Sequence, residues 1–280
     1  MKKSLSAFYF QLLTGGIFLF LFSGCKVIDP AEEIPCYIHI DKITLLNNEP
    51  SKITDAWVFV DNQLIGAFEL PCTFPVLVKS GDHDILVRAG IKMNGSATTR
   101  AIYPHYKGWE STVTLTQGQS TTIQPTAEFF SGVQFLWTED FESPGNALVA
   151  ESTSPANVWK DNTDVYEGSN SGIITLNTDS AYFVGRTAQP YALSTTSDVY
   201  LEMNYKSDVT ITVGVETPDH QYRPWVDVAP SAVWNKIYIN LNDVVIQQPI
   251  YTSYYMYIAC SKPADVSECK VHLDDMILLQ

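Results

Sequence analysis

The chain has 280 residues, and 17 basic side chains (Lys and Arg) stand against 31 acidic ones, for a formal net charge of −14 at pH 7. Hydrophobic residues make up 45% of the chain, which is enough for a buried core and excludes general disorder. Charged residues are scarce at 17% while Tyr and Phe are plentiful, which favours β-structure over coiled coils or helical repeats. The negative charge repels phosphate backbones and no basic stripe offsets it, so we expect no nucleic-acid partner.

The first 24 residues predict a signal peptide. Two lysines after the first Met are followed by an apolar run over 8–22 that ends at small residues. The run is too short and interrupted for a membrane span, which takes about 20 apolar residues. Residues 21–25 read Leu-Phe-Ser-Gly-Cys and resemble the lipobox of bacterial lipoproteins. The resemblance implies cleavage before Cys25, a diacylglycerol group on its sulfur and an acyl chain such as palmitate on its new amino group. The alternative is an ordinary signal peptide followed by a chance cysteine.

Residues 25–35 are then the lipidated cysteine and a short tether. Several buried acyl chains, at about 0.8 kcal/mol per CH₂, hold a protein stably on a membrane. We therefore expect an outer-membrane, lipid-anchored protein, on the cell surface or on the periplasmic face. Acidic residues in the tether, Asp29, Glu32 and Glu33, resemble the surface-export signal of Bacteroidetes lipoproteins. The alternative is that the acidic residues of the tether only increase solubility.

Residues 36–130 predict a first domain, an Ig-like β-sandwich. Short alternating segments are separated by turns, and no run has a helical period. The expected strands cover 56–60, 64–68, 73–78, 83–89, 98–103, 111–116 and 120–126. Within this domain 75–103 resembles an N-terminal module common in Bacteroidetes lipoproteins of unknown function, through Lys-Ser-Gly-Asp-His at 79–83, Ala-Gly-Ile-Lys-Met-Asn-Gly at 89–95 and Arg-Ala-Ile-Tyr-Pro at 100–104. We interpret 103–106 as an exposed loop.

Residues 133–280 predict a second domain, since strand periodicity lapses at Ser131 and Gly132. Asp-Phe-Glu at 140–142, Glu-Gly-Ser at 167–169 and Asp-Asp at 274–275 occur in this order. Together they resemble the galactose-binding-like jelly roll of many carbohydrate-binding modules. The resemblance implies a jelly-roll sandwich, so the fold class expected after the signal peptide is all-β with two sandwich domains.

The same resemblance implies a structural calcium ion between the first and last strands of the jelly roll. Calcium takes about six to eight oxygen ligands, chiefly from carboxylates and carbonyls. Without an ion, clustered acids repel one another or have raised pKa values. The alternative is that these acids face solvent at strand ends. The positions that match the resembled site are Asp140, Glu142, Glu167, Ser169, Asp274 and Asp275.

A group of aromatic and polar residues over 219–225 predicts a ligand-binding loop. The apolar face of a sugar ring buries well on an aromatic ring, while its hydroxyls need polar partners. We therefore predict glycan binding through Trp159, Tyr222, Arg223 and Trp225, and 251–255 extends this surface. For any single aromatic residue the alternative, packing in the sandwich core, is favoured.

The four cysteines after the predicted cleavage site are an even set in an oxidising compartment. Three pairings are open to four cysteines. Nearness in the sequence favours disulfides between Cys36 and Cys72 and between Cys260 and Cys269. Free buried thiols are the alternative, and metal binding is a poor one because no Cys-x-x-Cys spacing exists.

No catalytic motif stands out. The five histidines lie far apart in the sequence, and neither Gly-x-Ser-x-Gly nor His-Glu-x-x-His occurs. We therefore interpret the chain as a non-enzymatic, outer-membrane lipoprotein that binds glycans through its jelly roll. The first alternative is a structural or assembly lipoprotein that contacts other envelope proteins. A weaker alternative is a jelly-roll polysaccharide lyase or hydrolase, which requires an acid/base pair in a cleft.

Overall fold

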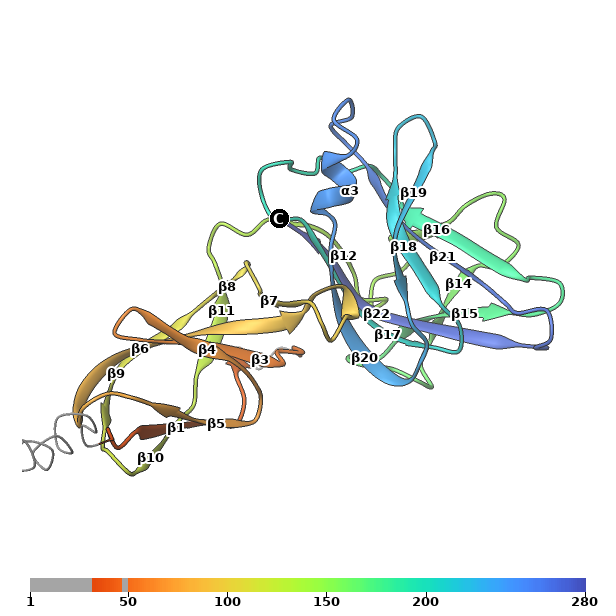
Figure 1. Cartoon of the computed structure of the whole chain (residues 1–280). Coiled ribbons are helices and arrows are strands. Elements are labelled where there is room, and N and C mark those ends of the chain that lie inside the picture. Colours follow the sequence, from red (N-terminus) through yellow and green to blue (C-terminus); the bar gives the residue numbers. More distant parts are fainter. Residues whose placement is uncertain (1–31, 47–49) are drawn as a thin grey trace, which may run out of the picture.

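The computed structural model describes residues 32–46 and 50–280. The predicted all-β class is confirmed, since the described residues form β-sheets with one short α-helix, α3 (Asn242–Ile246) (Figure 1). The described residues up to 130 form the N-terminal lobe, and 134–280 form the C-terminal lobe. The predicted signal peptide and Cys25 lie outside the described residues, as does most of the tether. No helix in the described ranges is long and apolar enough to cross a membrane.

The N-terminal lobe consists of three sheets, with strand orders β10-β1-β5, β2-β11-β8 and β4-β3-β6-β7, and β9 pairs with β6. Its elements are β1 (Cys36–Ile40), β2 (Thr44–Leu45), β3 (Asp55–Val60), β4 (Gln63–Glu69), β5 (Cys72–Val76), β6 (Gly81–Lys92), the 3₁₀ turn η1 (Met93–Gly95), β7 (Arg100–Ile102), β8 (Tyr106–Lys107), β9 (Trp109–Leu115), β10 (Ser120–Ile123) and β11 (Thr126–Phe129). Each predicted strand has a counterpart here. The expected strand 120–126 divides in two at Pro125, which has no N–H for a sheet ladder.

The C-terminal lobe is a sandwich of two sheets. The six-stranded sheet has the order β14-β15-β22-β17-β20, with β12 paired to β22, and the five-stranded sheet has the order β13-β16-β21-β18-β19. Its strands are β12 (Phe135–Glu139), β13 (Leu148–Ala150), β14 (Val158–Asp161), β15 (Ser171–Leu176), β16 (Tyr182–Thr187), β17 (Tyr200–Ser207), β18 (Ile211–Glu216), β19 (Tyr222–Val228), β20 (Ser231–Asn240), β21 (Tyr255–Ser261) and β22 (Cys269–Leu279).

Alternation along the strands builds the core of this sandwich. In β18, for example, Ile211, Val213 and Val215 face the core, because successive side chains of a strand point to opposite sides. Strands of both sheets contribute to the same cluster of buried apolar side chains. Each sheet therefore has one inner face in the core and one outer face whose side chains can meet a ligand or the other lobe.

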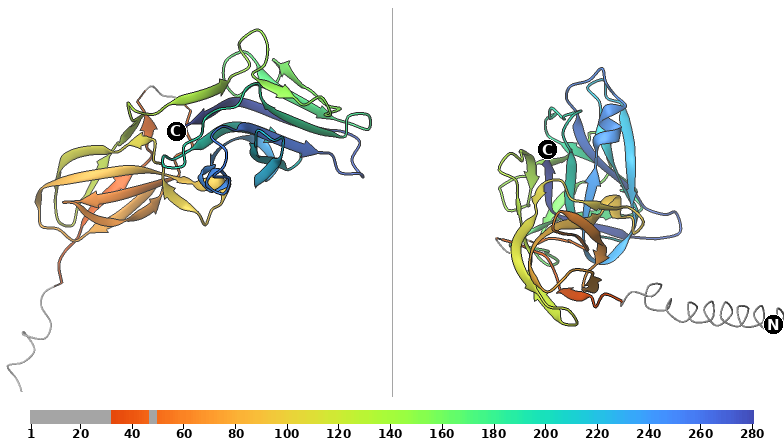
Figure 2. Two further views of the ribbon diagram at one scale, coloured as in Figure 1. Left: turned by 90° about the horizontal axis from the view of Figure 1, so that it is seen from above. Right: turned by 60° about the vertical axis from the view of Figure 1, so that its left-hand side comes forward.

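The two lobes lie end to end and touch through the outer face of the six-stranded sheet (Figures 1 and 2). The apolar core of the N-terminal lobe continues into the C-terminal lobe through Tyr200, Tyr238 and Leu279. Polar contacts cross the same junction. The Lys52 backbone N–H donates to the Tyr238 hydroxyl at 3.0 Å, and the Asn240 backbone N–H donates to Asn94 Oδ1 at 2.8 Å. The lobes are thus joined by a packed interface as well as by the chain.

Glu202 of β17 is the charged centre of this interlobe junction. Its side chain is 1% exposed, and the Tyr103 hydroxyl donates to its Oε1 at 2.6 Å. Lys236 Nζ lies 2.8 Å from its Oε2. The ring of Tyr103 also lies edge-on to the ring of Tyr200, with centroids 5.1 Å apart. A buried carboxylate costs free energy unless it is paired in this way.

The junction corrects the interpretation of residues 103–106 as an exposed loop. Tyr103, His105 and Tyr106 are buried, because the C-terminal lobe covers them. Sequence patterns within one lobe do not show that a second lobe will cover a surface turn. The turn is therefore part of the domain interface.

The four described cysteines are free thiols, and the sheet register contradicts the predicted disulfide between Cys36 and Cys72. Cys36 pairs with Val76 across β1 and β5, whereas Cys72 pairs with Ile40. The two cysteines are thus separated by four positions, roughly 13 Å at 3.3 Å per residue, beyond the roughly 7 Å that a disulfide spans. Cys260 and Cys269 belong to opposite sheets but to the same buried core, and burial together with Cys269 raises the pKa of the Cys260 thiol to about 12. A disulfide between these two cysteines stays a prediction of the sequence.

Removing the Tyr103 hydroxyl should loosen the interlobe junction. In Tyr103→Phe the buried Glu202 carboxylate loses a donor, so we expect the free energy of unfolding to fall by about 1–3 kcal/mol. Urea denaturation followed by tryptophan fluorescence measures this change. Tyr37→Phe, at a partly exposed strand position, is the matched control and should change it by less than about 0.5 kcal/mol. Equal losses in both variants would contradict the role of this hydrogen bond.

Candidate functional site

The outer face of the five-stranded sheet carries a cluster of aromatic and charged side chains. Strand alternation places Arg186 of β16, Glu216 of β18, Tyr222 of β19, and Tyr255 and Tyr257 of β21 on this face. The register brings them together: Tyr257 pairs with Arg186 on one side, and Glu216 pairs with both Tyr222 and Tyr255. We call this set, together with Glu151, the tyrosine face.

Arg186 is the hub of the tyrosine face. Its Nη1 donates to Glu216 Oε1 at 3.1 Å, and its Nε contacts Glu151 Oε1. The guanidinium carbon lies 3.9 Å from the centre of the Tyr255 ring, within range of a cation–π contact. Because its planar fork is held on three sides, Arg186 is positioned before any ligand arrives.

Glu216 has an unusual position for a carboxylate. Its side chain is only 2% exposed, and His220 Nδ1 lies 2.8 Å from the same Oε1 that accepts from Arg186. The second oxygen, Oε2, is buried and has no hydrogen-bond partner among the described residues. A buried acceptor without a donor costs free energy, so this oxygen is an unsatisfied acceptor beneath the tyrosine face.

Two tyrosine rings cover the sheet next to this carboxylate. The centroids of Tyr222 and Tyr257 are 4.9 Å apart with the rings tilted by 60°. The backbone beneath is Gly214, where an added Cβ would lie 2.2 Å from the Arg223 carbonyl oxygen and 2.9 Å from the Tyr257 ring. Burial raises the pKa of the Tyr257 hydroxyl to about 12, so this hydroxyl stays protonated at neutral pH. Tyr222 is 41% exposed and offers its ring to solvent.

The same sheet face continues into a hollow of about 540 Å³. Outer-face side chains of four neighbouring strands line it: Tyr182, Val184, Thr212, Asp227, Ala259 and Ser261. A hollow of this volume falls within the range of about 300–1,000 Å³ that small-molecule sites occupy. The face therefore combines exposed rings, fixed charges and a concave surface.

The four residues of the predicted glycan surface do not share one face. The segment 219–225, expected to be a loop, is part of strand β19 from Tyr222 onward. Successive side chains of a strand point to opposite faces of the sheet, so the residues of this segment do not all lie on one face. Tyr222 belongs to the tyrosine face, while Trp225 packs against the core and donates from its Nε1 to the Asn240 carbonyl oxygen at 2.7 Å. Arg223 alternates with Tyr222 and is half-buried. Trp159, 64% exposed, is on β14 in the other sheet.

Sequence reasoning missed Glu151, Arg186, Glu216 and Tyr257. One signal was available, since Tyr255 and Tyr257 recur at the strand period beside buried Met256 and Ile258. The partners on β16 and β18 carried no such signal, because only the sheet order places them next to β21.

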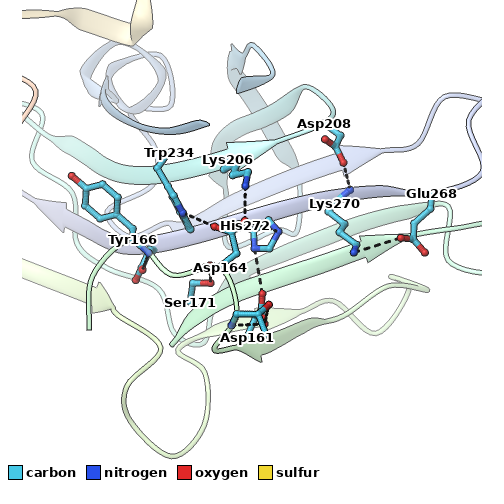
Figure 3. A network of polar contacts seen from close by, with 12 residues as sticks. Asp161, Asp164, Tyr166, Ser171, Lys206, Asp208, Trp234, Glu268, Lys270 and His272 are labelled. Carbon is cyan, nitrogen blue, oxygen red and sulfur yellow. Dashed lines mark hydrogen bonds and ion pairs between the residues drawn. The ribbon is translucent and has the colours of Figure 1, made fainter. Parts of the chain in front are cut away.

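A second polar cluster lies on the outer face of the six-stranded sheet (Figure 3). Asp164 is its centre: Trp234 Nε1 donates to Oδ1 at 2.9 Å, and Lys206 Nζ donates to Oδ2 at 2.5 Å. His272 Nδ1 lies 3.7 Å from Asp161 Oδ2, and burial lowers the pKa of this imidazole. A hollow of about 370 Å³ adjoins the cluster. Both Asp164 oxygens are already engaged within the protein.

The acidic positions predicted for calcium lie near one another, and backbone N–H groups donate to the oxygens of three of them, Asp140, Glu142 and Asp274. Glu142 Oε1 accepts from the N–H groups of Ser169 and Asn170 at 2.7 and 2.8 Å. Gly168, with φ +74°, lets the turn close around that oxygen, since an added Cβ would lie 2.6 Å from it. Asp274 Oδ2 accepts from two further backbone N–H groups, those of Tyr166 and Glu167.

This arrangement does not fit a metal centre as it stands. No set of three His, Cys, Asp or Glu side chains in the described ranges is placed to hold a metal ion. Asp140 accepts from the backbone N–H of Glu142, two residues along. Burial and the neighbouring Asp275 raise the pKa of Asp274 to about 7, and burial and Glu167 raise that of Asp275. Calcium binding through these residues stays a prediction of the sequence.

Comparison with known proteins gives fold likenesses only. No protein-family model and no curated protein matches the chain. Among solved structures it is similar to the CBM22-1 xylan-binding domain of Paenibacillus barcinonensis Xyn10C, at 14% identity and TM-score 0.36, over 52% of this chain and 93% of that domain. It is also similar to the family 30 carbohydrate-binding module of Clostridium thermocellum Cel9D-Cel44B, at 16% identity and TM-score 0.34, over 54% of this chain and 94% of that one. Likenesses this distant assign no ligand.

The raised pKa of Asp274 predicts a pH-dependent stability. The folded state holds this proton more tightly than the unfolded state, where the pKa is near 3.8. Between pH 4 and 7 the folded state therefore binds more protons, and the free energy of unfolding falls as the pH rises. In EDTA, the melting temperature should decline from pH 5 to pH 8, and Asp274→Asn should decline less.

Asp227→Asn, at an exposed strand position, is the matched control and should follow the wild type. An Asp274→Asn variant that declines as steeply as the wild type would show that other groups cause the pH dependence. The same melting measurement without EDTA tests calcium, because an ion bound to the native state stabilises it by mass action. A melting temperature that does not respond to millimolar calcium at pH 8 contradicts the calcium prediction.

Proposed function

We propose that the chain is a non-catalytic, lipid-anchored protein of the outer membrane that binds glycans through the tyrosine face. The observation that carries this proposal is the buried Glu216 carboxylate with one unpartnered oxygen beside the exposed ring of Tyr222. An aromatic ring buries the apolar face of a sugar, and the free oxygen accepts from one of its hydroxyls. Both features lie on one sheet face, fixed by Arg186.

The charges on this face favour a neutral glycan rich in hydroxyl donors. Two carboxylates, Glu151 and Glu216, share the single guanidinium of Arg186. Asp227 lines the hollow next to them. With a net charge of −14 on the whole chain as well, a polyanionic glycan would be repelled. Hydroxyl groups, in contrast, donate to each of these oxygens.

The proposed anchor places this face at the envelope. Lipidation at Cys25, followed by a tether up to Pro35, would leave both lobes outside the bilayer. Glycan binding then needs only a modest affinity per site, since many copies on one surface act together. If the chain binds no glycan, the alternative is an assembly lipoprotein whose lobes contact other envelope proteins.

Substitutions on the tyrosine face should weaken glycan binding. We expect Tyr222→Ala and Glu216→Gln each to weaken affinity for neutral oligosaccharides at least tenfold, which corresponds to about 1.4 kcal/mol, because one removes the stacking ring and the other an acceptor. A glycan array identifies the ligand, and isothermal titration measures its affinity. Circular dichroism verifies that each variant is folded.

Trp159→Ala is the matched control, since this exposed aromatic lies on the opposite sheet. Its affinity should equal that of the wild type. Loss of binding in Trp159→Ala alone would move the site to the six-stranded sheet, and an array without any hit for the wild type would reject the function.

Lipidation predicts a simple change in fractionation. In Cys25→Ser the acceptor sulfur for the diacylglycerol group is absent, so the protein should move from the membrane fraction to the soluble fraction. Detergent partitioning with Triton X-114 measures this shift. Lys26→Ser, one residue further on, is the control and should stay with the membranes. Membrane retention of the Cys25→Ser variant would exclude the anchor.

A further inference from the structure

A cavity of about 350 Å³ lies between the two lobes, away from the tyrosine face. Aromatic side chains form one wall: Tyr106 and Phe129 of the N-terminal lobe and Phe135 of β12. Polar side chains of the C-terminal lobe form the other: Glu167, Glu202, Asn204, Lys236 and Asp275. The volume lies within the range of about 300–1,000 Å³ that ligand sites occupy.

Among the charged groups of the polar wall, Lys236 is the hydrogen-bond donor, and its ammonium group already has partners within the protein. Lys236 Nζ lies 2.8 Å from Glu202 Oε2 and donates to the Pro50 carbonyl oxygen at 3.2 Å. Tyr103, behind the wall, donates to the other oxygen of Glu202. The Glu202 charge is therefore balanced by Lys236, and neither group is available to bind a ligand.

The acceptors of the wall, in contrast, are largely unused. Asn204 is fully buried, and its Oδ1 has no hydrogen-bond partner in the described part of the chain. Its Nδ2 donates to Asp275 Oδ2 over a long 3.4 Å. Glu167 is exposed. Once Glu202 and Lys236 are paired, the remaining charged groups of the cavity are the carboxylates of Glu167 and Asp275, which lie beside the unpartnered amide oxygen of Asn204. A ligand that complements them must therefore carry hydrogen-bond donors and a positive charge.

We propose that this interlobe cavity binds a primary alkylammonium group. Three N–H donors match the oxygens of Asn204, Asp275 and Glu167. The alkyl stem lies along Phe129 and Phe135, where aromatic rings bury methylene groups and attract the adjacent cation. The site uses the six-stranded sheet and both lobes, so it is independent of the glycan site proposed above.

The test uses n-butylammonium as the probe and the full chain in detergent. Ligand-observed saturation-transfer NMR titrations should show saturable binding, and n-butanol, which has the same stem without the charge, should bind at least tenfold more weakly. Asp275→Asn and Glu167→Gln should each weaken butylammonium binding at least threefold. Glu167 is exposed, so its variant tests the site even where a buried substitution disturbs the fold.

Two controls separate this site from the rest of the surface. Glu110→Gln removes an exposed carboxylate on β9 and should leave butylammonium affinity unchanged. Tyr222→Ala should do the same, so failure of the glycan proposal and failure of this one are distinguishable.

Several results would overturn the proposal. Equal affinities for n-butanol and n-butylammonium would show that the carboxylates do not select a cation. Unchanged binding in both acidic variants would place the probe elsewhere. Competition by micromolar calcium would identify the cavity as a metal site, and tighter binding of glucosamine than of butylammonium would exclude the alkyl stem.

Discussion

The pairing of one buried carboxylate, Glu202, holds the two lobes in a single arrangement. Because an unpaired charge in this position would cost several kcal/mol, the hydroxyl of Tyr103 from one lobe and the ammonium of Lys236 from the other must both be in place. Aromatic packing of Tyr103 against Tyr200 and Tyr238 surrounds the pair with apolar surface. This contact, the apolar packing around it and the hydrogen bonds of Lys52 and Asn240 together orient the two lobes.

Docking of the lobes gives the two sheets of the C-terminal sandwich different roles. The N-terminal lobe covers one end of the outer face of the six-stranded sheet, and the network around Asp164 uses the polar groups of the other end (Figure 3). The N-terminal lobe contacts the five-stranded sheet at β19, through η1, and leaves the ring of Tyr222 exposed. The tyrosine face of this sheet keeps an unpartnered acceptor in Glu216 and an exposed ring in Tyr222, which are the two features a sugar requires.

The acidic motif shared by the first and last strands shows how similar residues can serve two purposes. In this structure Glu142 closes the turn after Glu167 by accepting hydrogen bonds from the backbone N–H groups of Ser169 and Asn170. Asp274 accepts the same kind of contact, yet its pKa stays raised because the carboxyl is buried and its neighbour Asp275 is also acidic. Through these hydrogen bonds the motif fixes the turn onto the last strand.

The all-β class and the approximate positions of the strands followed from the sequence by itself, because alternation and turn residues act between near neighbours along the chain. Trp225 shows where prediction from the sequence failed. Because it lies in a strand rather than a loop, its side chain packs against the core, on the side of the sheet opposite Tyr222. The tyrosine face depends on Arg186, Glu216 and Tyr257 lying on adjacent strands, and the junction depends on Tyr103 reaching Glu202. Only the tertiary structure decided these contacts, since they join residues far apart in the chain through strand order and lobe docking, which local periodicity does not encode.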